Sequence, residues 1–174
     1  TPFRGLRYTL AIVADKLVAK GGFMKLTIIT LAAVVALTTA ATAETVAPAN
    51  VQYDEYGAVG ASLTGVAGDV ANGRKVFMNR KKGNCLACHV NDDMSEQSFH
   101  GEVGPELNGV GDRWETAELR GIVANAKMMF DGTIMPGFYK DAGFTRPLKN
   151  FSGKSILTAQ EVEDVVAYIS TLKE

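Results

Sequence analysis

The segment Cys85-Leu86-Ala87-Cys88-His89 decides how the rest of the chain is interpreted. Two thiols separated by two residues can add to the two vinyl groups of one haem, and the histidine that follows then lies over the iron. The Cys-x-x-Cys-His pattern is therefore typical of c-type haem attachment. We predict one haem c, bound covalently through Cys85 and Cys88, with His89 as an axial iron ligand.

Two other kinds of site share part of this pattern. A structural zinc site needs further ligands, but the 174-residue chain has only these two cysteines, and His100 is its only other histidine. A redox-active thiol pair of the thioredoxin type belongs in a βαβ context, and the sequence has no strand-rich region. A disulfide between the two thiols is geometrically allowed, but the adjacent histidine favours haem.

The N-terminal part of the sequence predicts export. Met24 and a lysine precede an apolar run over 26–37, and small residues follow as far as Ala43, which is the pattern of a secretory signal peptide. A membrane anchor is disfavoured because the run is shorter than the ~20 residues of a spanning helix. We expect a signal peptide over 24–43, a periplasmic protein and no membrane contact after cleavage.

Residues 1–23 precede the methionine that begins the signal peptide. Lys-Gly-Gly at 20–22 is the peptide that a purine-rich ribosome-binding site would encode if it were translated by mistake. We expect residues 1–23 to be an over-extended gene prediction that is not translated.

The exported part divides into an N-terminal arm over 44–68 and a cytochrome-like domain over 69–174. The arm is rich in alanine, glycine and valine and has little helical periodicity. It has the character of a loose terminus or of a segment ordered by a partner, and its apolar residues leave both alternatives open.

The domain is predicted to be all-α. Apolar spacing predicts helices over 69–82, over 116–130 and from 158 onward. Asp69 is expected to cap the first helix, and a capping box formed by Thr158 and Glu161 opens the last one. The long glycine- and proline-rich stretch over 131–155 requires something to pack against, and a haem would serve.

The iron also needs a sixth ligand. The candidate side chains are those of Met78, Met94, Met128, Met129, Met135 and His100. Met135 is favoured because it lies in a downstream loop and precedes Pro136, which restricts its backbone to extended conformations. Ligation by His89 and Met135 fills the iron site, which suits electron transfer. It also raises the reduction potential of the haem relative to ligation by two histidines. We expect His100 to be solvated or hydrogen-bonded in a loop.

Three further residues are candidates for supporting roles. An axial histidine needs a partner for its other ring nitrogen, and the carbonyl of Pro105 is the expected acceptor for His89. Arg113 and Trp114 are candidates for hydrogen bonds to a haem propionate, with a surface charge and an ordinary core residue as the alternatives.

Composition excludes some functions. The formal net charge is −1, whereas a nucleic-acid-binding protein normally has a basic excess. The content of hydrophobic residues, 47%, is that of a folded protein.

The domain resembles class I cytochromes c. The features that carry the resemblance are the haem motif, Gly104-Pro105-x-Leu107, the Met-Pro loop and a last helix with a tyrosine. The resemblance implies an all-α fold of a few helices around one haem, in which the first and last helices cross with small and aromatic residues in contact. Gly73, Phe77 and Tyr168 match those positions.

Three stretches, 132–140, 151–154 and 156–169, more narrowly resemble the SoxX family of monohaem cytochromes. This resemblance implies one haem with His/Met ligation and a SoxA-like cytochrome subunit as partner. It also implies a carrier protein like SoxYZ and a downstream cytochrome as electron acceptor. The implied enzyme is an L-cysteine S-thiosulfotransferase, which couples thiosulfate oxidatively to a cysteine of the carrier.

The haem motif limits the share of such a reaction that this chain can take. Thioether bonds use both cysteines, so no thiol remains to handle sulfur, and we expect the catalytic residue in the partner chain. This chain is expected to move electrons. The alternative is a free-standing periplasmic class I cytochrome c that carries electrons, and a haem-based ligand sensor is disfavoured by a methionine on the iron.

Overall fold

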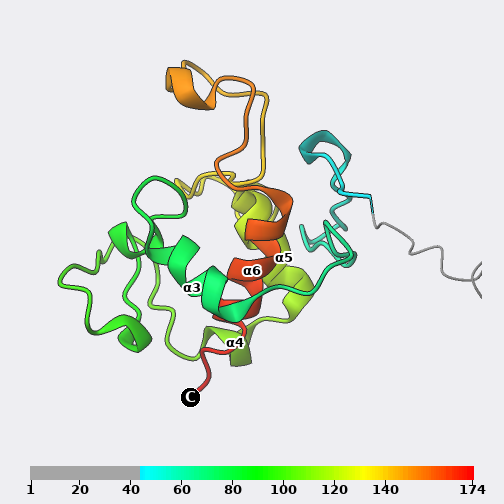
Figure 1. Cartoon of the computed structure of the whole chain (residues 1–174). Coiled ribbons are helices and arrows are strands. Elements are labelled where there is room, and N and C mark those ends of the chain that lie inside the picture. The colour runs from blue at the N-terminus through cyan, green and yellow to red at the C-terminus, as the bar shows by residue number, and fades with distance from the viewer. Residues whose placement is uncertain (1–43) are drawn as a thin grey trace, which may run out of the picture. The chain divides into compact units, whose positions relative to one another are not determined.

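The structure, a computed structural model, describes residues 44–174. This part of the chain consists of helices and loops and contains no strand. The helices are α3 (Val70–Met78), α4 (Val110–Arg113), α5 (Thr116–Asn125) and α6 (Ala159–Ile169). Short 3-10 turns lie at Pro48–Asn50, Cys85–Ala87, Asp92–Met94, Ala126–Met128 and Lys149–Phe151. The all-α prediction is confirmed (Figure 1). The predictions for residues 1–23 and for the signal peptide lie outside the described residues.

The two predicted helix caps are confirmed. The carboxylate of Asp69 accepts a hydrogen bond from the Asn72 N–H at 3.0 Å. At the start of α6, the Thr158 hydroxyl accepts from the Glu161 N–H at 3.2 Å, and the Glu161 carboxylate accepts from the Thr158 N–H at 3.0 Å. These reciprocal bonds satisfy donors that a helix N-terminus otherwise leaves free.

The first two helices are shorter than predicted. α3 ends at Met78 because Asn79 has an extended backbone with ψ 112°, which does not continue the helix. α5 ends at Asn125, since the carbonyl of Ala124 accepts from the Tyr139 N–H at 2.9 Å and so binds the following loop. A 3-10 turn continues the chain where the sequence predicted further α-helix.

Helices α3 and α6 cross at very close range (Figure 1). A Cβ atom on Gly73 would lie 1.9 Å from the carbonyl oxygen of Asp164, so only glycine allows the two backbones to approach this closely. One turn further along α3, the ring of Phe77 packs edge-on against Tyr168 with centroids 5.5 Å apart. The predicted contact of small and aromatic residues between the first and last helices is confirmed.

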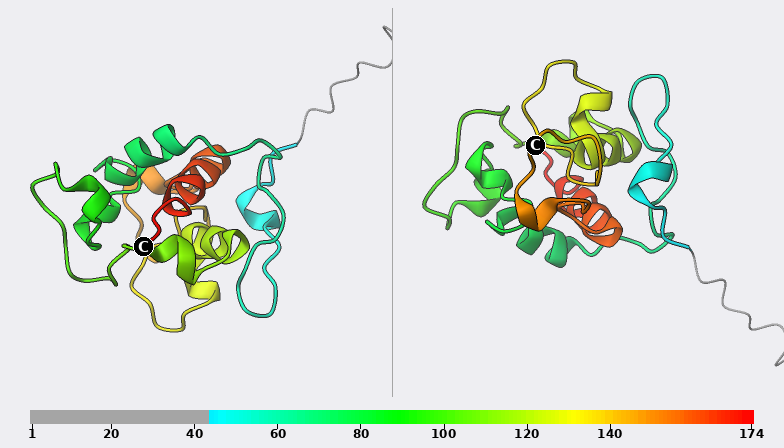
Figure 2. Two further views of the ribbon diagram at one scale, coloured as in Figure 1. Left: turned by 90° about the horizontal axis from the view of Figure 1, so that it is seen from below. Right: turned by 90° about the horizontal axis from the view of Figure 1, so that it is seen from above.

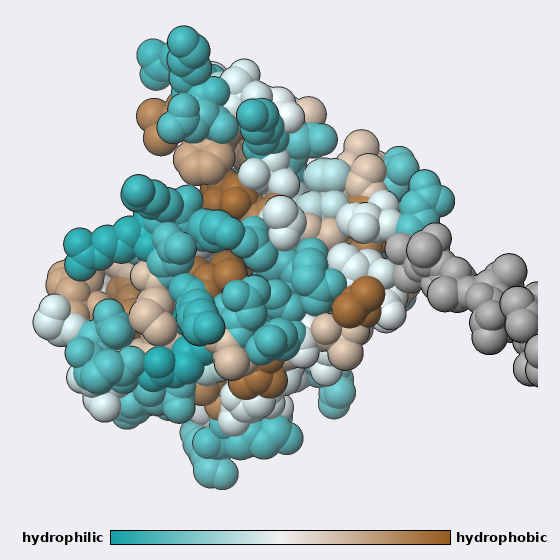
Figure 3. Space-filling view, viewed as in Figure 1, coloured by the Kyte–Doolittle hydropathy of each residue, from teal (hydrophilic) through white to brown (hydrophobic). Residues whose placement is uncertain are grey.

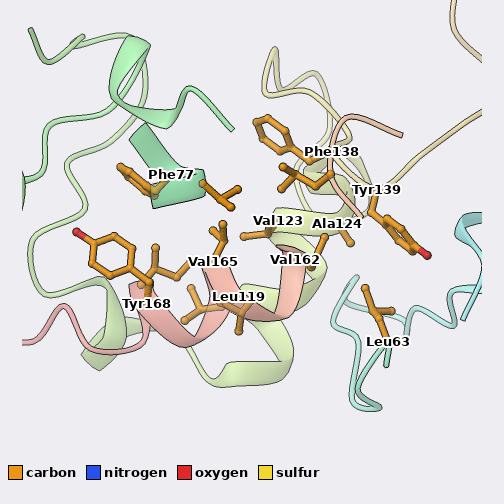
Figure 4. Packing of buried hydrophobic residues seen from close by; sticks show 14 of the residues in the cluster. Leu63, Phe77, Leu119, Val123, Ala124, Phe138, Tyr139, Val162, Val165 and Tyr168 are labelled. Atoms are coloured by element: carbon orange, nitrogen blue, oxygen red, sulfur yellow. The ribbon is translucent and has the colours of Figure 1, made fainter. Parts of the chain in front are cut away.

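The core lies between α3, α5 and α6 and extends to the loop that follows α5 (Figure 4). Its labelled members are Leu63, Phe77, Leu119, Val123, Ala124, Phe138, Tyr139, Val162, Val165 and Tyr168. The apolar face predicted for the last helix is buried throughout. None of the described helices is long and apolar enough to cross a membrane.

The arm packs against this chain's own α5 and α6 (Figure 2). Val59 and Leu63 are buried, and the Val59 N–H donates to the carbonyl of Ala117 at 2.9 Å. A buried ion pair completes the contact: Arg120 Nε lies 2.9 Å from the Glu163 carboxylate. Arg120 also donates to the carbonyl of Val59 at 2.8 Å, and Glu163 accepts from the Leu63 N–H at 2.7 Å. From the sequence, the arm could be either a loose terminus or a segment ordered by a partner. In the structure it is ordered by contacts with the rest of its own chain.

Substituting Gly73 by alanine is expected to lower the free energy of unfolding by about 3 kcal/mol, because the added methyl group forces the crossing helices apart. Urea unfolding of the haem-loaded protein measures the effect. Gly60→Ala is the matched control, since no atom lies within 4 Å of its Cβ position. Equal losses in the two variants would show that the crossing does not need a glycine.

Substituting Glu163 by glutamine is expected to cost about 3 kcal/mol, because it leaves the Arg120 guanidinium buried without its counter-charge. The arm should also become sensitive to proteolysis between residues 44 and 63. Urea unfolding and mass spectrometry of limited digests are the measurements, with Glu55→Gln, an exposed change in the same arm, as control. An undigested arm in Glu163→Gln would contradict the anchoring role of the ion pair.

Candidate haem site

The Cys-x-x-Cys-His segment forms one tight turn. The carbonyl of Cys85 accepts from the N–H groups of both Cys88 and His89 at 3.0 Å. Leu86 is buried in the core and fixes the turn to the body of the domain, and its carbonyl accepts from the Gly101 N–H at 2.8 Å. The three side chains that haem attachment requires are thus presented by a single rigid element.

The imidazole of His89 is oriented as predicted. Its Nδ1 lies 2.7 Å from the carbonyl oxygen of Pro105, and because a carbonyl can only accept, Nδ1 carries the proton. In the neutral imidazole, Nε2 then keeps a lone pair that it can donate to a metal. Gly104 lies against the ring, since a Cβ there would come within 2.4 Å of it. The Gly-Pro turn thus sets both the tautomer and the plane of the ring.

The two cysteines are free thiols in the structure. Burial raises the pKa of the Cys85 thiol to about 12, so this group is a neutral thiol at physiological pH. A redox-active pair needs a thiol of lowered pKa to supply the thiolate. The environment of Cys85 therefore does not make this sulfur a reactive thiolate.

Met135 is half-buried, in the loop after α5. It packs against the same buried cluster that Cys85 contacts. Its N–H donates to the Thr133 hydroxyl at 3.2 Å, and its carbonyl accepts from Lys127 Nζ at 2.9 Å. Met135 and Cys85 thus border the same hydrophobic core.

The other candidate ligands are placed differently. Met94 is fully buried, and half of Met128 is exposed (50%). His100 uses both ring nitrogens within its loop: Nδ1 accepts from the Asn91 N–H at 3.3 Å, so Nε2 donates to the carbonyl of Met94 at 3.1 Å. The prediction that His100 is hydrogen-bonded in a loop is confirmed.

Arg113 and Trp114, the candidate propionate partners, have contacts within the chain. Arg113 donates to the carbonyls of Asn108 and Glu106, so it supports the turn that carries Pro105. Trp114 packs edge-on against Phe130 with centroids 5.8 Å apart. Both residues thus stabilise segments next to the candidate site.

One polar cluster was missed from the sequence. The Tyr168 hydroxyl donates to the Asp93 carboxylate at 2.7 Å and accepts from the Asn91 amide at 2.9 Å, and Arg74 Nε lies 3.1 Å from Asp93. The Tyr168 hydroxyl, and then Arg74, lower the pKa of Asp93. The cluster ties α3 and α6 to the segment after the motif. Its only signal in the sequence is a tyrosine on the apolar face of the last helix.

The residues present fit a covalently bound haem. Two thiols and a correctly protonated imidazole are the donor set that it requires. On the Met135 side, the Asn125 amide oxygen is buried without a hydrogen-bond partner among the described residues and faces Gly137. Because an unpaired buried polar atom is costly, this oxygen requires a hydrogen-bond donor.

Comparisons with known proteins agree with this geometry. The family model described as Cytochrome c matches residues 70–173. Among solved structures, a chain of the crystal structure of SoxXA from P. pantotrophus is 52% identical with a TM-score of 0.69, and the match covers 74% of this chain and 98% of that chain. A comparison with curated proteins gave no match. The chain therefore belongs to the cytochrome c family, its cofactor is covalently bound haem c, and the cytochromes that it specifically resembles are those of the SoxX type.

Proposed function

We propose that this chain is the electron-transfer haem c subunit of a periplasmic complex that oxidatively couples thiosulfate to a cysteine of a carrier protein. The observation that carries the proposal is the His89 imidazole, held by Pro105 beside two thiols, in a chain 52% identical to a chain of SoxXA. The periplasmic location rests on the signal peptide proposed over 24–43, with cleavage after Ala43.

The residues divide the binding of the cofactor between them. Cys85 and Cys88 would hold the haem through thioether bonds, and His89 and Met135 would supply the nitrogen and sulfur ligands of its iron. When bound, the haem supplies a reversible one-electron carrier. The chain's own task is to hold its two ligands in place, which His89 does through Pro105 and Met135 does from a loop packed on the core.

The sulfur chemistry belongs to other chains. With both cysteines in thioether bonds, this chain has no thiol that can carry a sulfur atom. We therefore place the catalytic cysteine of the L-cysteine S-thiosulfotransferase in a SoxA-like cytochrome partner. A carrier like SoxYZ receives the product, and a downstream cytochrome accepts the electrons.

The loop over 140–154 is the surface that we assign to docking with an acidic partner. It projects from the body of the domain (Figure 1), and hydrophilic side chains cover much of its visible face (Figure 3). Its basic side chains are those of Lys140, Arg146, Lys149 and Lys154. Leu148 is also 74% exposed there. Basic charge around an exposed apolar residue favours fast association with an acidic surface and partial burial on docking.

Replacing Met135 by alanine is expected to abolish the sulfur-to-iron charge-transfer band of the ferric protein and to lower its reduction potential, because the thioether favours ferrous iron. Optical spectroscopy and potentiometric titration are the measurements. Met128→Ala is the control, since that methionine is half-exposed. A Met135→Ala protein that keeps the band would exclude Met135 as the ligand.

Affinity capture of the tagged protein from its native periplasm is expected to co-purify a second cytochrome that has a cysteine outside its haem motifs. Changing all four basic residues of the 140–154 loop to glutamine should reduce this capture and weaken its dependence on salt. Recovery of the tagged protein as a monomer, without a partner at low salt, would instead support the free-standing carrier.

A further inference from the structure

Lys127 holds the loop that carries Met135. It lies in the 3-10 turn at Ala126–Met128, directly after α5. Its Nζ donates to the carbonyl of Thr133 at 2.7 Å and to the carbonyl of Met135 at 2.9 Å. Both acceptors belong to the loop, and one of them is the carbonyl of the candidate iron ligand itself.

This loop has few other internal supports. Among the described residues, the remaining hydrogen bonds of residues 131–137 are the Met135 N–H to the Thr133 hydroxyl at 3.2 Å and a long one, 3.4 Å, from the Thr133 N–H to Phe130. Pro136 has no N–H to donate, and Ile134 is 78% exposed. The two charge-assisted bonds from Lys127 are therefore the shortest that hold this stretch, and such bonds are stronger than neutral ones.

Apart from Lys127, short hydrogen bonds hold the loop only at its ends. On one side the Phe130 N–H donates to the carbonyl of Ala126 at 2.9 Å, and on the other the Tyr139 N–H donates to Ala124 at 2.9 Å. Both acceptors lie at the end of α5 or directly after it, as Lys127 does. The end of α5 is thus one platform that anchors the loop at both ends and, through Lys127, in its middle.

We propose that Lys127 is a positioning residue that keeps the Met135 thioether on the iron. Its ammonium group bridges the carbonyls on either side of Ile134 and so resists the outward movement of the loop that would release the ligand. This inference rests on the proposed ligation by Met135. Lys127 itself touches neither the iron nor the thioether.

The consequence is a defined equilibrium between a closed loop with the ligand bound and an open loop with the iron accessible. An external ligand such as imidazole binds only the open form, so its apparent affinity rises in proportion to the open fraction. Losing two charge-assisted hydrogen bonds at a solvent-exposed site is expected to raise that fraction about tenfold.

Imidazole titration of the haem-loaded ferric protein tests the proposal. Lys127→Met should keep the sulfur-to-iron charge-transfer band without imidazole but bind imidazole about tenfold more tightly than the wild type. Lys75→Met is the matched control, because Lys75 is an exposed lysine of α3 and makes no side-chain hydrogen bond within the described residues. It should bind imidazole as the wild type does. Urea unfolding of both variants shows whether an effect is confined to the loop.

Two failures can be told apart. Equal imidazole affinities in Lys127→Met and Lys75→Met, with the band present in both, would overturn the positioning role and leave Met135 as the ligand. Persistence of the band in Met135→Ala would overturn the ligation, and the role of Lys127 with it.

Discussion

The close approach of α3 and α6 is the constraint on which the rest of the structure depends. With Gly73 against the carbonyl of Asp164, the two helix backbones are nearly in contact. That distance brings Phe77 against Tyr168 and buries the apolar face of α6 in the core. The haem motif begins a few residues after α3 ends, so the position of the crossing also determines where the motif lies. A shift of either helix would displace the attachment turn.

The two sides of the proposed iron site are built in different ways. On the histidine side, the ring is held by a carbonyl in a Gly-Pro turn and by a glycine packed against its plane. That turn is supported by Arg113 and by the motif itself, through the Gly104 N–H donating to the carbonyl of Cys88 at 2.7 Å. On the methionine side, a loop is anchored to the end of one helix. We infer a firm proximal ligand and a distal ligand whose binding depends on a few polar contacts.

Much of the fold could be predicted from the sequence because its determinants are local. The caps at Asp69 and Thr158 depend on side chains within three residues of each helix start. The carbonyl of Pro105 could be predicted as the partner of His89, because an axial histidine needs a hydrogen-bond acceptor for its other ring nitrogen. The end of α5 could not be found in this way, since the carbonyl of Ala124 binds Tyr139, which the local pattern does not show. The early end of α3 likewise depends on the extended backbone of Asn79, which apolar spacing does not mark.

The polar contacts between distant segments were beyond the reach of sequence patterns. Asp93 and Tyr168 meet although 75 positions separate them. The buried pair of Arg120 and Glu163 appears in the sequence as two ordinary charged residues on helices. Charge on an otherwise apolar helix face is the only sign of such a pair, and it does not identify the partner. Whether the arm is ordered could not be predicted for the same reason, because the residues that anchor it lie on α5 and α6.

The contact between Leu63 and Glu163 has a consequence for how the protein matures. The two residues are 100 positions apart, so a segment near the start of the described residues packs on the helix near their end. Such non-local contacts form slowly and only once the whole chain is available. The fold therefore closes only when α6 is present, and the motif at 85–89 lies between the two partners of this contact in the sequence.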